Sequence, residues 1–183
     1  VVPGLIDFIL FKINNREVDV GIYGGKWVKE VFCRWLQKYV MKYQHAMIDA
    51  LKNSGRFRAP GDFHDLHSYI SGYLGDGNKM GEGWLLTAEM LELINTGVPN
   101  IVCTQPFGCL PNHIVGKGMI RKIKDDYPWS NVVAIDYDPG ATRINQENRI
   151  KLMLANARAL AKEQRAHTLD PEEGPSGEPV SAR

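Results

Sequence analysis

The fold of this chain depends most on the stretch Val98-Pro-Asn-Ile-Val-Cys-Thr-Gln-Pro-Phe-Gly-Cys109-Leu-Pro-Asn-His113. Residues 98–104 form a short apolar run that ends before a proline, which predicts a buried strand. Pro111 begins an amphipathic pattern that predicts a helix over residues 111–127. Cys109 therefore lies in a tight loop between a strand end and a helix start. In open α/β sheets ligands collect at this position, and a helix N-terminus favours negative charge there, including a thiolate.

Other elements are predicted on both sides of this stretch. After it, residues 131–135 have the pattern of a second strand, and residues 141–162 that of a last helix. Before it, the alternation of Val18, Val20 and Ile22 with small or polar residues predicts a further strand. The remaining expected helices span residues 5–13, 26–53, 63–74 (with Asp62 as N-cap) and 84–95.

This order of elements predicts the fold class. Helix–strand alternation with short connections is typical of an α/β fold, here a three-layer Rossmann-like lobe with a short parallel sheet flanked by helices. The helical run between residues 26 and 97 is longer than a simple crossover, so we interpret it as a helical insertion. We expect residues 1–164 to form a single α/β lobe of a longer protein, because the chain begins inside an apolar segment. Residues 165–183 are rich in proline and glycine, which predicts a disordered tail.

Composition excludes several classes of protein. With 183 residues, 44% of them hydrophobic, the chain can bury one core. The net charge is +1 and the 22 basic residues are scattered, which argues against nucleic-acid binding. No apolar run approaches the roughly 20 residues that span a bilayer, so we expect no contact with a membrane, and no signal peptide is visible. The three cysteines are irregularly spaced, which argues against disulfides and predicts a reducing, cytoplasmic location.

Two interpretations of Cys109 stay open from the residues alone. Free cysteine is often a small buried hydrophobe, but the prolines and the glycine of this loop also suit an exposed, functional thiol. His113, in the first turn of the predicted helix, either contacts a ligand or is satisfied by loop carbonyls. Cys103 and Cys33 fall at apolar strand and helix positions, so we expect both in the core. The spacing of the three cysteines makes no zinc or iron–sulfur signature.

Carboxylates and histidines elsewhere are further candidates. Asp136 ends the last predicted strand, where carboxylates often contact substrates, and its role stays open. Asp138 suits capping of the helix that follows. His64 and His67 lie beside acidic residues, and a solvated helix face explains them more simply than a metal site does. The turn Gly81-Glu-Gly-Trp84 follows no predicted strand and lacks the Lys-Ser/Thr of a phosphate loop, which argues against nucleotide binding there.

Three segments, taken in order, resemble one protein family. They are Gly81-Glu-Gly-Trp-Leu-Leu-Thr-Ala-Glu-Met90, Cys103-Thr-Gln-Pro-Phe-Gly-Cys-Leu-Pro-Asn-His113, and Asp136-Tyr-Asp-Pro-Gly-Ala141 with residues 145–154. Together they resemble the C-terminal part of the large 2-hydroxyacyl-CoA dehydratase activase-like proteins of anaerobic bacteria, over about residues 81–155. In that family an ATP-binding activase portion is joined to a portion similar to the dehydratase subunits. The latter has Rossmann-like lobes that hold an iron–sulfur cluster between them.

The resemblance implies roles for particular residues. Cys109 matches the position at which this lobe supplies a thiolate to the cluster, which makes it the predicted metal ligand. Cofactor-binding roles are assigned to Asn112, His113, Glu82, Trp84, Gln105 and Asp136. ATP is expected to bind outside this chain, and the other cluster cysteines are expected from other lobes of the same polypeptide. A dehydratase or reductase partner and a CoA thioester are the further partners that the resemblance implies.

Three hypotheses about function result. The first is a lobe of an ATP-dependent electron-transfer protein that contributes one cysteine to a shared iron–sulfur cluster. The alternative is a non-catalytic docking or scaffold module that keeps the lobe but has a degenerate site. In the third, Cys109 is the nucleophile of a stand-alone enzyme and is activated by the helix start and His113.

Overall fold

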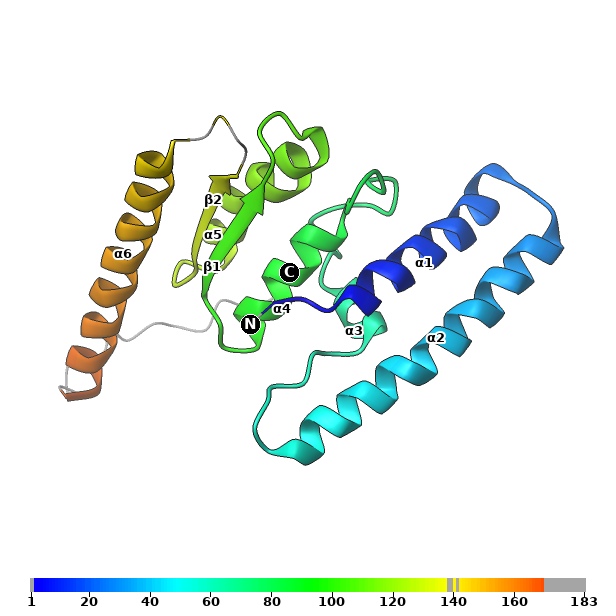
Figure 1. Cartoon of the computed structure of the whole chain (residues 1–183), viewed down its shortest axis with the longest axis horizontal. Coiled ribbons are helices and arrows are strands. Elements are labelled where there is room, and N and C mark those ends of the chain that lie inside the picture. The colour runs from blue at the N-terminus through cyan, green and yellow to red at the C-terminus, as the bar shows by residue number, and fades with distance from the viewer. Residues whose placement is uncertain (1, 138–139, 141, 170–183) are drawn as a thin grey trace, which may run out of the picture.

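The computed structural model describes residues 2–137, 140 and 142–169. Along its longest axis the molecule places α6, the sheet, α4 and then a hairpin of two long helices, as Figure 1 shows. The bounds of the elements are α1 Leu5–Tyr23, α2 Trp27–Ser54, α3 Phe63–Ser68, α4 Leu85–Asn95, β1 Asn100–Gln105, η1 Asn112–Gly116, η2 Lys117–Met119, α5 Ile120–Asp126, β2 Asn131–Asp136 and α6 Arg143–Leu169. The described chain is therefore mostly helical, with strands only in its second half.

The described residues form one parallel sheet of two strands, β1 and β2. Asn100 lies opposite Asn131 and Gln105 lies opposite Asp136, so both strands end at the same level. Between them the chain passes through η1, η2 and α5, which is the crossover that a parallel pair requires. The prediction of a parallel sheet with helical connections is thus confirmed, and the fold is mixed α/β.

The predicted strand at residues 18–22 is wrong, because these residues belong to α1. Helix α1 packs along α2, and its buried residues follow helical rather than alternate spacing. Val20 is buried at 8% exposure, whereas Ile22, two residues later, is 62% exposed. A strand would have placed both side chains on one face. Packing against the neighbouring helix therefore outweighs the local alternation.

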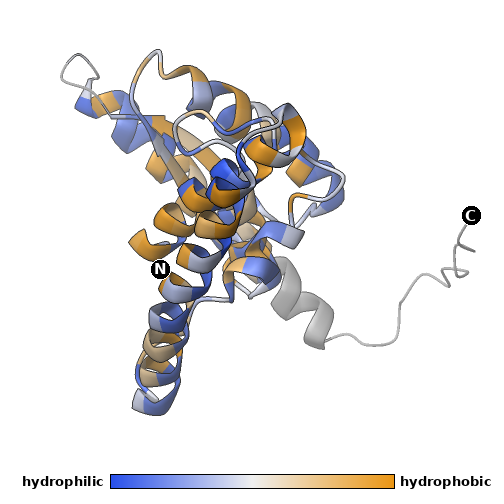
Figure 2. Ribbon diagram, turned by 90° about the vertical axis from the view of Figure 1, so that its right-hand side faces the viewer, coloured by the Kyte–Doolittle hydropathy of each residue, from blue (hydrophilic) through white to orange (hydrophobic). Residues whose placement is uncertain are grey.

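Two hydrophobic clusters meet at α4. The first joins α4 to the helices that precede it and includes Phe11, Phe63 and Trp84, while the second joins α4 to the sheet and to Ile123 of α5. Trp84 is fully buried, with its ring 4.9 Å from that of Phe11 in an edge-on arrangement. Figure 2 shows apolar residues concentrated in the body of the molecule, where the sheet and its covering helices meet. Helix α4 thus contributes side chains to both hydrophobic clusters and connects the N-terminal helices to the sheet.

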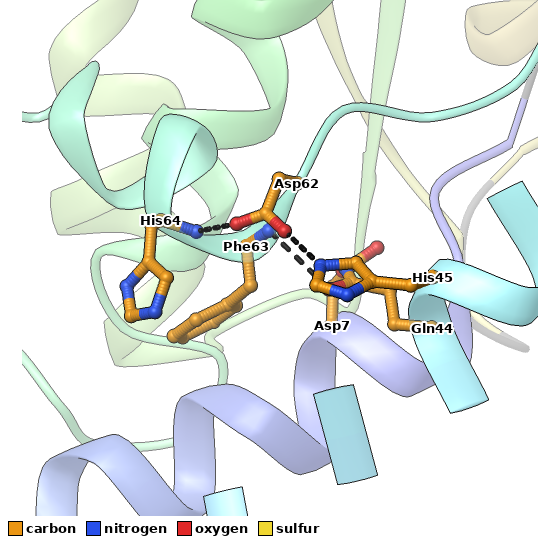
Figure 3. Close-up of polar contacts among 6 residues, drawn as sticks. All are labelled: Asp7, Gln44, His45, Asp62, Phe63 and His64. Carbon is orange, nitrogen blue, oxygen red and sulfur yellow. Dashed lines mark hydrogen bonds and ion pairs between the residues drawn. The ribbon is translucent and has the colours of Figure 1, made fainter. Parts of the chain in front are cut away.

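A polar cluster, whose polar side chains are buried only at Asp7 and Gln44, joins the first three helices, and Figure 3 shows its members. Asp62 caps α3 as predicted, since its carboxylate accepts the His64 backbone N–H at 2.8 Å. The other carboxylate oxygen of Asp62 is 2.5 Å from His45 Nε2 on α2. Gln44 of α2 donates to Asp7 of α1 at 2.6 Å. Burial, and then the charge of Glu92, raise the pKa of Asp7 to about 6.

The helix predicted for residues 111–127 is divided into three pieces. A π-helical turn, η1, is followed by the 3₁₀ turn η2, and only α5 is regular α-helix. Close contacts explain the irregular part. A Cβ on Gly116 would lie 3.3 Å from Cys103 Sγ, and one on Gly118 would lie 3.0 Å from the His113 carbonyl oxygen. Glycine at these two positions permits the close approach of the backbone where the segment departs from regular α-helix.

The end of the chain also differs from the prediction. Helix α6 continues to Leu169, so residues 165–169 of the predicted disordered tail are helical, and the rest of that tail lies outside the described residues. The predicted cap Asp138 lies outside them as well. Among the described helices, none has the length and apolar character needed to cross a membrane.

Candidate functional site

The cysteine loop lies at the carboxyl end of β1, as predicted from the sequence. After Gln105 the chain turns through Gly108, whose φ of 72° lies in the left-handed region that favours glycine. The Cys109 N–H donates to the Pro106 carbonyl at 3.3 Å, and the Cys109 carbonyl accepts the His113 N–H at 3.0 Å. These bonds hold Cys109 at the start of the helical segment that leads into η1.

The Cys109 thiol is the most accessible sulfhydryl of the three cysteines. It is half-buried, whereas Cys33 and Cys103 are buried at 7% and 6% exposure, which confirms the expectation for those two. Burial, and then the charge of Glu89, raise the pKa of the Cys103 thiol, so that it stays protonated. The Cys109 sulfur accepts a hydrogen bond from Asn112 Nδ2 at 3.1 Å. A donor pointing at sulfur stabilises negative charge on it, as a metal-bound thiolate requires.

His113 matches the loop-carbonyl interpretation at one of its ring nitrogens. Its Nδ1 lies 2.9 Å from the Cys109 carbonyl oxygen, and because a carbonyl only accepts, Nδ1 carries the proton in this bond. The Nε2 atom is then the nitrogen left for a ligand. The ring is half-buried beside the cysteine it helps to position.

Gln105 and Asp136 meet at the carboxyl ends of the two strands. Gln105 Nε2 donates to Asp136 Oδ1 at 2.7 Å. Gln105 is only 2% exposed, and its Oε1 has no hydrogen-bond partner within the described part of the chain. A buried acceptor without a donor costs about 1–3 kcal/mol, and this oxygen is enclosed by the described residues and does not line the neighbouring cavity. Gln105 and Asp136, both predicted from the sequence as cofactor-binding residues, are thus in direct contact.

A cavity of about 650 Å³ opens beside this pair, between the end of β2 and the start of α6. Phe107, Asp136, Asn145 and Arg149 are among the residues that line it. Phe107 comes from the cysteine loop, but Cys109 itself is not among the described lining residues. The cavity has the position at which open α/β sheets bind ligands. Sequence reasoning missed Asn145 and Arg149; their four-residue spacing on one helix face was the available signal.

The turn before α4 touches the cysteine loop. A Cβ on Gly81 would lie 3.2 Å from the Pro111 ring, so this turn packs directly behind the loop. The Thr87 hydroxyl of α4 donates to the Val115 carbonyl at 2.5 Å and fixes η1 against α4. Thr87 is fully buried and was not identified from the sequence. The turn before α4 and the segment that follows Cys109 are far apart in the sequence, but they pack against each other and form one wall of the candidate site.

Glu82 and Trp84 have different positions in this wall. Glu82 is half-buried in the turn. Trp84 belongs to the hydrophobic core, and its indole N–H donates to Asn15 Oδ1 at 3.3 Å. Packing accounts fully for Trp84, and its cofactor-binding role stays a prediction, as does that of Glu82.

Comparison of the chain with protein-family models, with curated proteins and with solved structures finds no match in any of the three. The family resemblance drawn from the three quoted segments therefore stays a prediction. Within the described residues, no three or more His, Cys, Asp or Glu side chains are grouped so as to hold a metal ion.

Proposed function

We propose that this chain is the C-terminal, Rossmann-like lobe of a cytoplasmic, ATP-dependent electron-transfer protein of the 2-hydroxyacyl-CoA dehydratase/activase type. Its role is to supply the Cys109 thiolate to an iron–sulfur cluster that is shared with other lobes. The observation that carries the proposal is the half-buried Cys109 sulfur with Asn112 Nδ2 donating to it at 3.1 Å, at the carboxyl end of a parallel strand.

The residues at the loop fit one ligand of such a cluster. Iron–sulfur clusters are held by thiolates, and hydrogen bonds to sulfur together with local burial set their reduction potential. Asn112 supplies such a bond, and it is buried at 5% exposure, so its amide is held in place. The described residues offer one accessible thiol, so the remaining ligands have to come from other lobes.

The neighbouring polar residues suit the substrate side of the site. When bound, the cluster would supply low-potential one-electron transfer. The residues of this chain would bind and orient the substrate or partner. Asp136, whose Oδ1 accepts a hydrogen bond from Gln105 Nε2, lines the cavity of about 650 Å³. This cavity is of the size that ligand pockets have. We assign it to part of a CoA thioester or to a partner surface.

The test is iron and sulfide analysis of the anaerobically purified complete protein with Cys109→Ala. We expect loss of most cluster iron and of electron transfer. Cys33→Ala is the matched control, because it removes a thiol buried far from the loop and should keep the iron. Full cluster occupancy and activity in Cys109→Ala would show that the ligand assignment is wrong.

A second candidate is the non-catalytic docking or scaffold module. It is favoured by the lack of a metal-binding group within the described residues. The same iron analysis on the wild-type complete protein separates the two functions: a protein without iron and acid-labile sulfide would be the docking module.

A further inference from the structure

Among the residues that the structure describes, strand β1 pairs with a neighbour on only one side. At its two ends, Asn131 N–H donates to the Pro99 carbonyl at 2.8 Å and Tyr137 N–H donates to the Gln105 carbonyl at 2.7 Å. In a parallel ladder, alternate residues of a strand bond to the neighbour. The odd-numbered residues of β1 therefore face β2, and the N–H and C=O groups of residues 100, 102 and 104 point to the opposite edge. Within the described residues, no strand pairs with that edge.

A groove of about 380 Å³ runs along this open edge. Residues 100–104 of β1 all line it. Successive side chains of a strand point to opposite faces, so a cavity that touches five in a row faces the backbone edge of the strand. Figure 1 shows β1 on the side of the sheet that faces α4, with β2 and α6 beyond it.

The opposite wall of the groove is one face of α4, and Pro3, which precedes α1, also lines the groove. The face of α4 is formed by Leu86, Glu89, Met90 and Leu93, whose spacing of three, four and seven residues places them on one side of a helix. Three of the four are apolar. Glu89 is a carboxylic acid within this apolar wall, and burial, followed by the charges of Asp7, Glu92 and Glu82, raises its pKa to about 8. Because the charges that raise this pKa are all acidic, a basic group placed here would favour the ionised form of Glu89 and pair with it.

We propose that the groove along β1 binds an extended polypeptide segment that adds a third strand to the sheet and is not part of residues 1–183. The main chain of this segment pairs with the outward N–H and C=O groups of Asn100, Val102 and Thr104. On the side that faces α4 it carries apolar residues, which contact Leu86, Met90 and Leu93, and one lysine or arginine, which pairs with Glu89. Strand addition of this kind takes its affinity from the main chain and its specificity from alternate side chains.

The shape of the groove favours an extended strand over other occupants. A strand added to a sheet lies roughly 4.8 Å from its neighbour and rises about 3.3 Å per residue, so it presents a donor and an acceptor at every second residue, as the open edge does. A helix satisfies its own backbone groups and leaves the edge unpaired. Parallel sheets are normally covered on both faces and contain more than two strands, which is the state that a third strand approaches.

The other available occupants fit less well. Residues 170–183 contain four acidic residues, which would further disfavour ionisation of Glu89, and three prolines, which lack the N–H that strand pairing needs. A second copy of the chain could enter the groove only with its own β1, and its own α4 lies beside that strand. The groove has space for a single strand, so we expect the helix of the second copy to obstruct this pairing. We therefore infer that the occupant is a segment from outside these residues that carries apolar side chains and one lysine or arginine.

The test uses one synthetic peptide, acetyl-Val-Thr-Arg-Thr-Val-Thr-amide, with the metal-free chain of residues 1–183. Amide hydrogen exchange is followed by NMR. We expect saturating peptide to slow exchange of the Val102 and Thr104 N–H groups at least tenfold, while the Cys103 and Gln105 N–H groups, which already bond to β2, change little. Cys109→Ala should bind the peptide as the wild type does, so failure here is distinguishable from failure of the proposed cluster.

Three controls separate strand pairing from other binding. The same peptide with N-methyl groups on alternate residues cannot pair, and should give no protection. Val102→Pro removes an outward N–H without removing a bond to β2 and should weaken binding at least tenfold, while Val102→Thr should bind normally. Glu89→Gln should weaken binding of the arginine peptide severalfold.

The proposal would be overturned by the binding experiment or by the oligomeric state. In the binding experiment, the contradicting result is absence of protection at Val102 and Thr104 with saturating peptide, or equal protection by the N-methylated peptide. The contradicting oligomeric state is a wild-type chain that dimerises in light scattering and becomes monomeric in Val102→Pro, because the edge would then pair with a second copy.

Discussion

The two outer edges of the sheet differ in how their backbone groups are satisfied. On β2, the outward carbonyls of Ala134 and Asp136 accept hydrogen bonds from Arg149 Nη1 at 3.0 Å and from Gln146 Nε2 at 3.1 Å, both on α6. On β1, the corresponding groups line a groove of about 380 Å³. Two outward carbonyls of β2 are therefore bonded by side chains of α6, whereas the outward groups of β1 border a groove.

We interpret the open edge of β1 as a binding feature of the fold. Unpaired strand edges invite unwanted association, and proteins usually cover them. Here Gln146 and Arg149 bond to carbonyls at the outer edge of β2. At the outer edge of β1, α4 is separated from the strand by a groove and forms its far wall. The contrast predicts that equivalent changes on the two strands have unequal effects.

The largest difference is expected from truncating a side chain on each strand. Ile135 of β2 is 1% exposed, whereas Val102 of β1 is 38% exposed at the groove. We expect Ile135→Ala to lower the free energy of unfolding by about 2–5 kcal/mol, because it leaves a cavity in a packed layer. Val102→Ala should cost less than about 1 kcal/mol. Urea unfolding of both variants measures this; equal losses would mean that the open edge is packed in solution.

A pH-dependent effect is expected from Glu89 on the groove wall. Its folded-state pKa of about 8 lies above its ordinary value of 4.5, so the folded state keeps a proton that the unfolded chain releases. Stability from this group is complete below about pH 4.5 and is lost as pH rises towards 8. We expect Glu89→Gln to be more stable than wild type at pH 8 by roughly 2 kcal/mol, reduced from the full linkage value because the groove admits water.

The measurement is urea unfolding of wild type and Glu89→Gln at pH 5, 6.5 and 8. The stability difference between them should grow with pH. Asp7, whose pKa is also raised, is present in both proteins, so its contribution largely cancels. A difference that stays constant over this range would contradict the burial of Glu89.

A smaller effect is expected from removing one of the side-chain bonds at the outer edge of β2. Arg149→Ala removes the donor to the Ala134 carbonyl, and water can reach the freed group because the Arg149 side chain is exposed. We expect a loss of about 1 kcal/mol in the free energy of unfolding. Arg149→Lys should recover part of it, since an ammonium group can still donate. Thermal unfolding monitored by circular dichroism is sufficient, and a loss as large as that of Ile135→Ala would show a structural role beyond edge capping.

Much of the second half of the fold was predictable from sequence. The two strands, the turn at Gly108 and the helices at residues 84–95 and after residue 141 follow from apolar runs bounded by proline and glycine. The strand predicted at residues 18–22 failed for a physical reason. Alternation over five residues is a weak signal, and packing of α1 along α2 buries positions at helical spacing instead.

The candidate site was predictable in its position but not in its contacts. The proline and glycine residues around Cys109 predicted a loop at the end of a strand, and the structure has that loop there. The bond from Asn112 to sulfur, the pairing of Gln105 with Asp136 and the support from Thr87 depend on distances between segments that are far apart in sequence. Trp84, in the turn before α4, lies in the hydrophobic core, and its predicted cofactor-binding role stays a prediction.

The sequence by itself determined which residues form strands near positions 100 and 131, where the cysteine loop begins, and that Cys33 and Cys103 are core residues. These depend on local patterns of apolar residues, prolines and glycines, which act over a few residues. Only the tertiary structure decided which strand edge α6 closes, which edge borders a groove, and which carboxylic acid is buried in its wall. Those outcomes depend on how α4 and α6 pack against the sheet. Packing between elements that are far apart in the sequence cannot be predicted from a local pattern of residues.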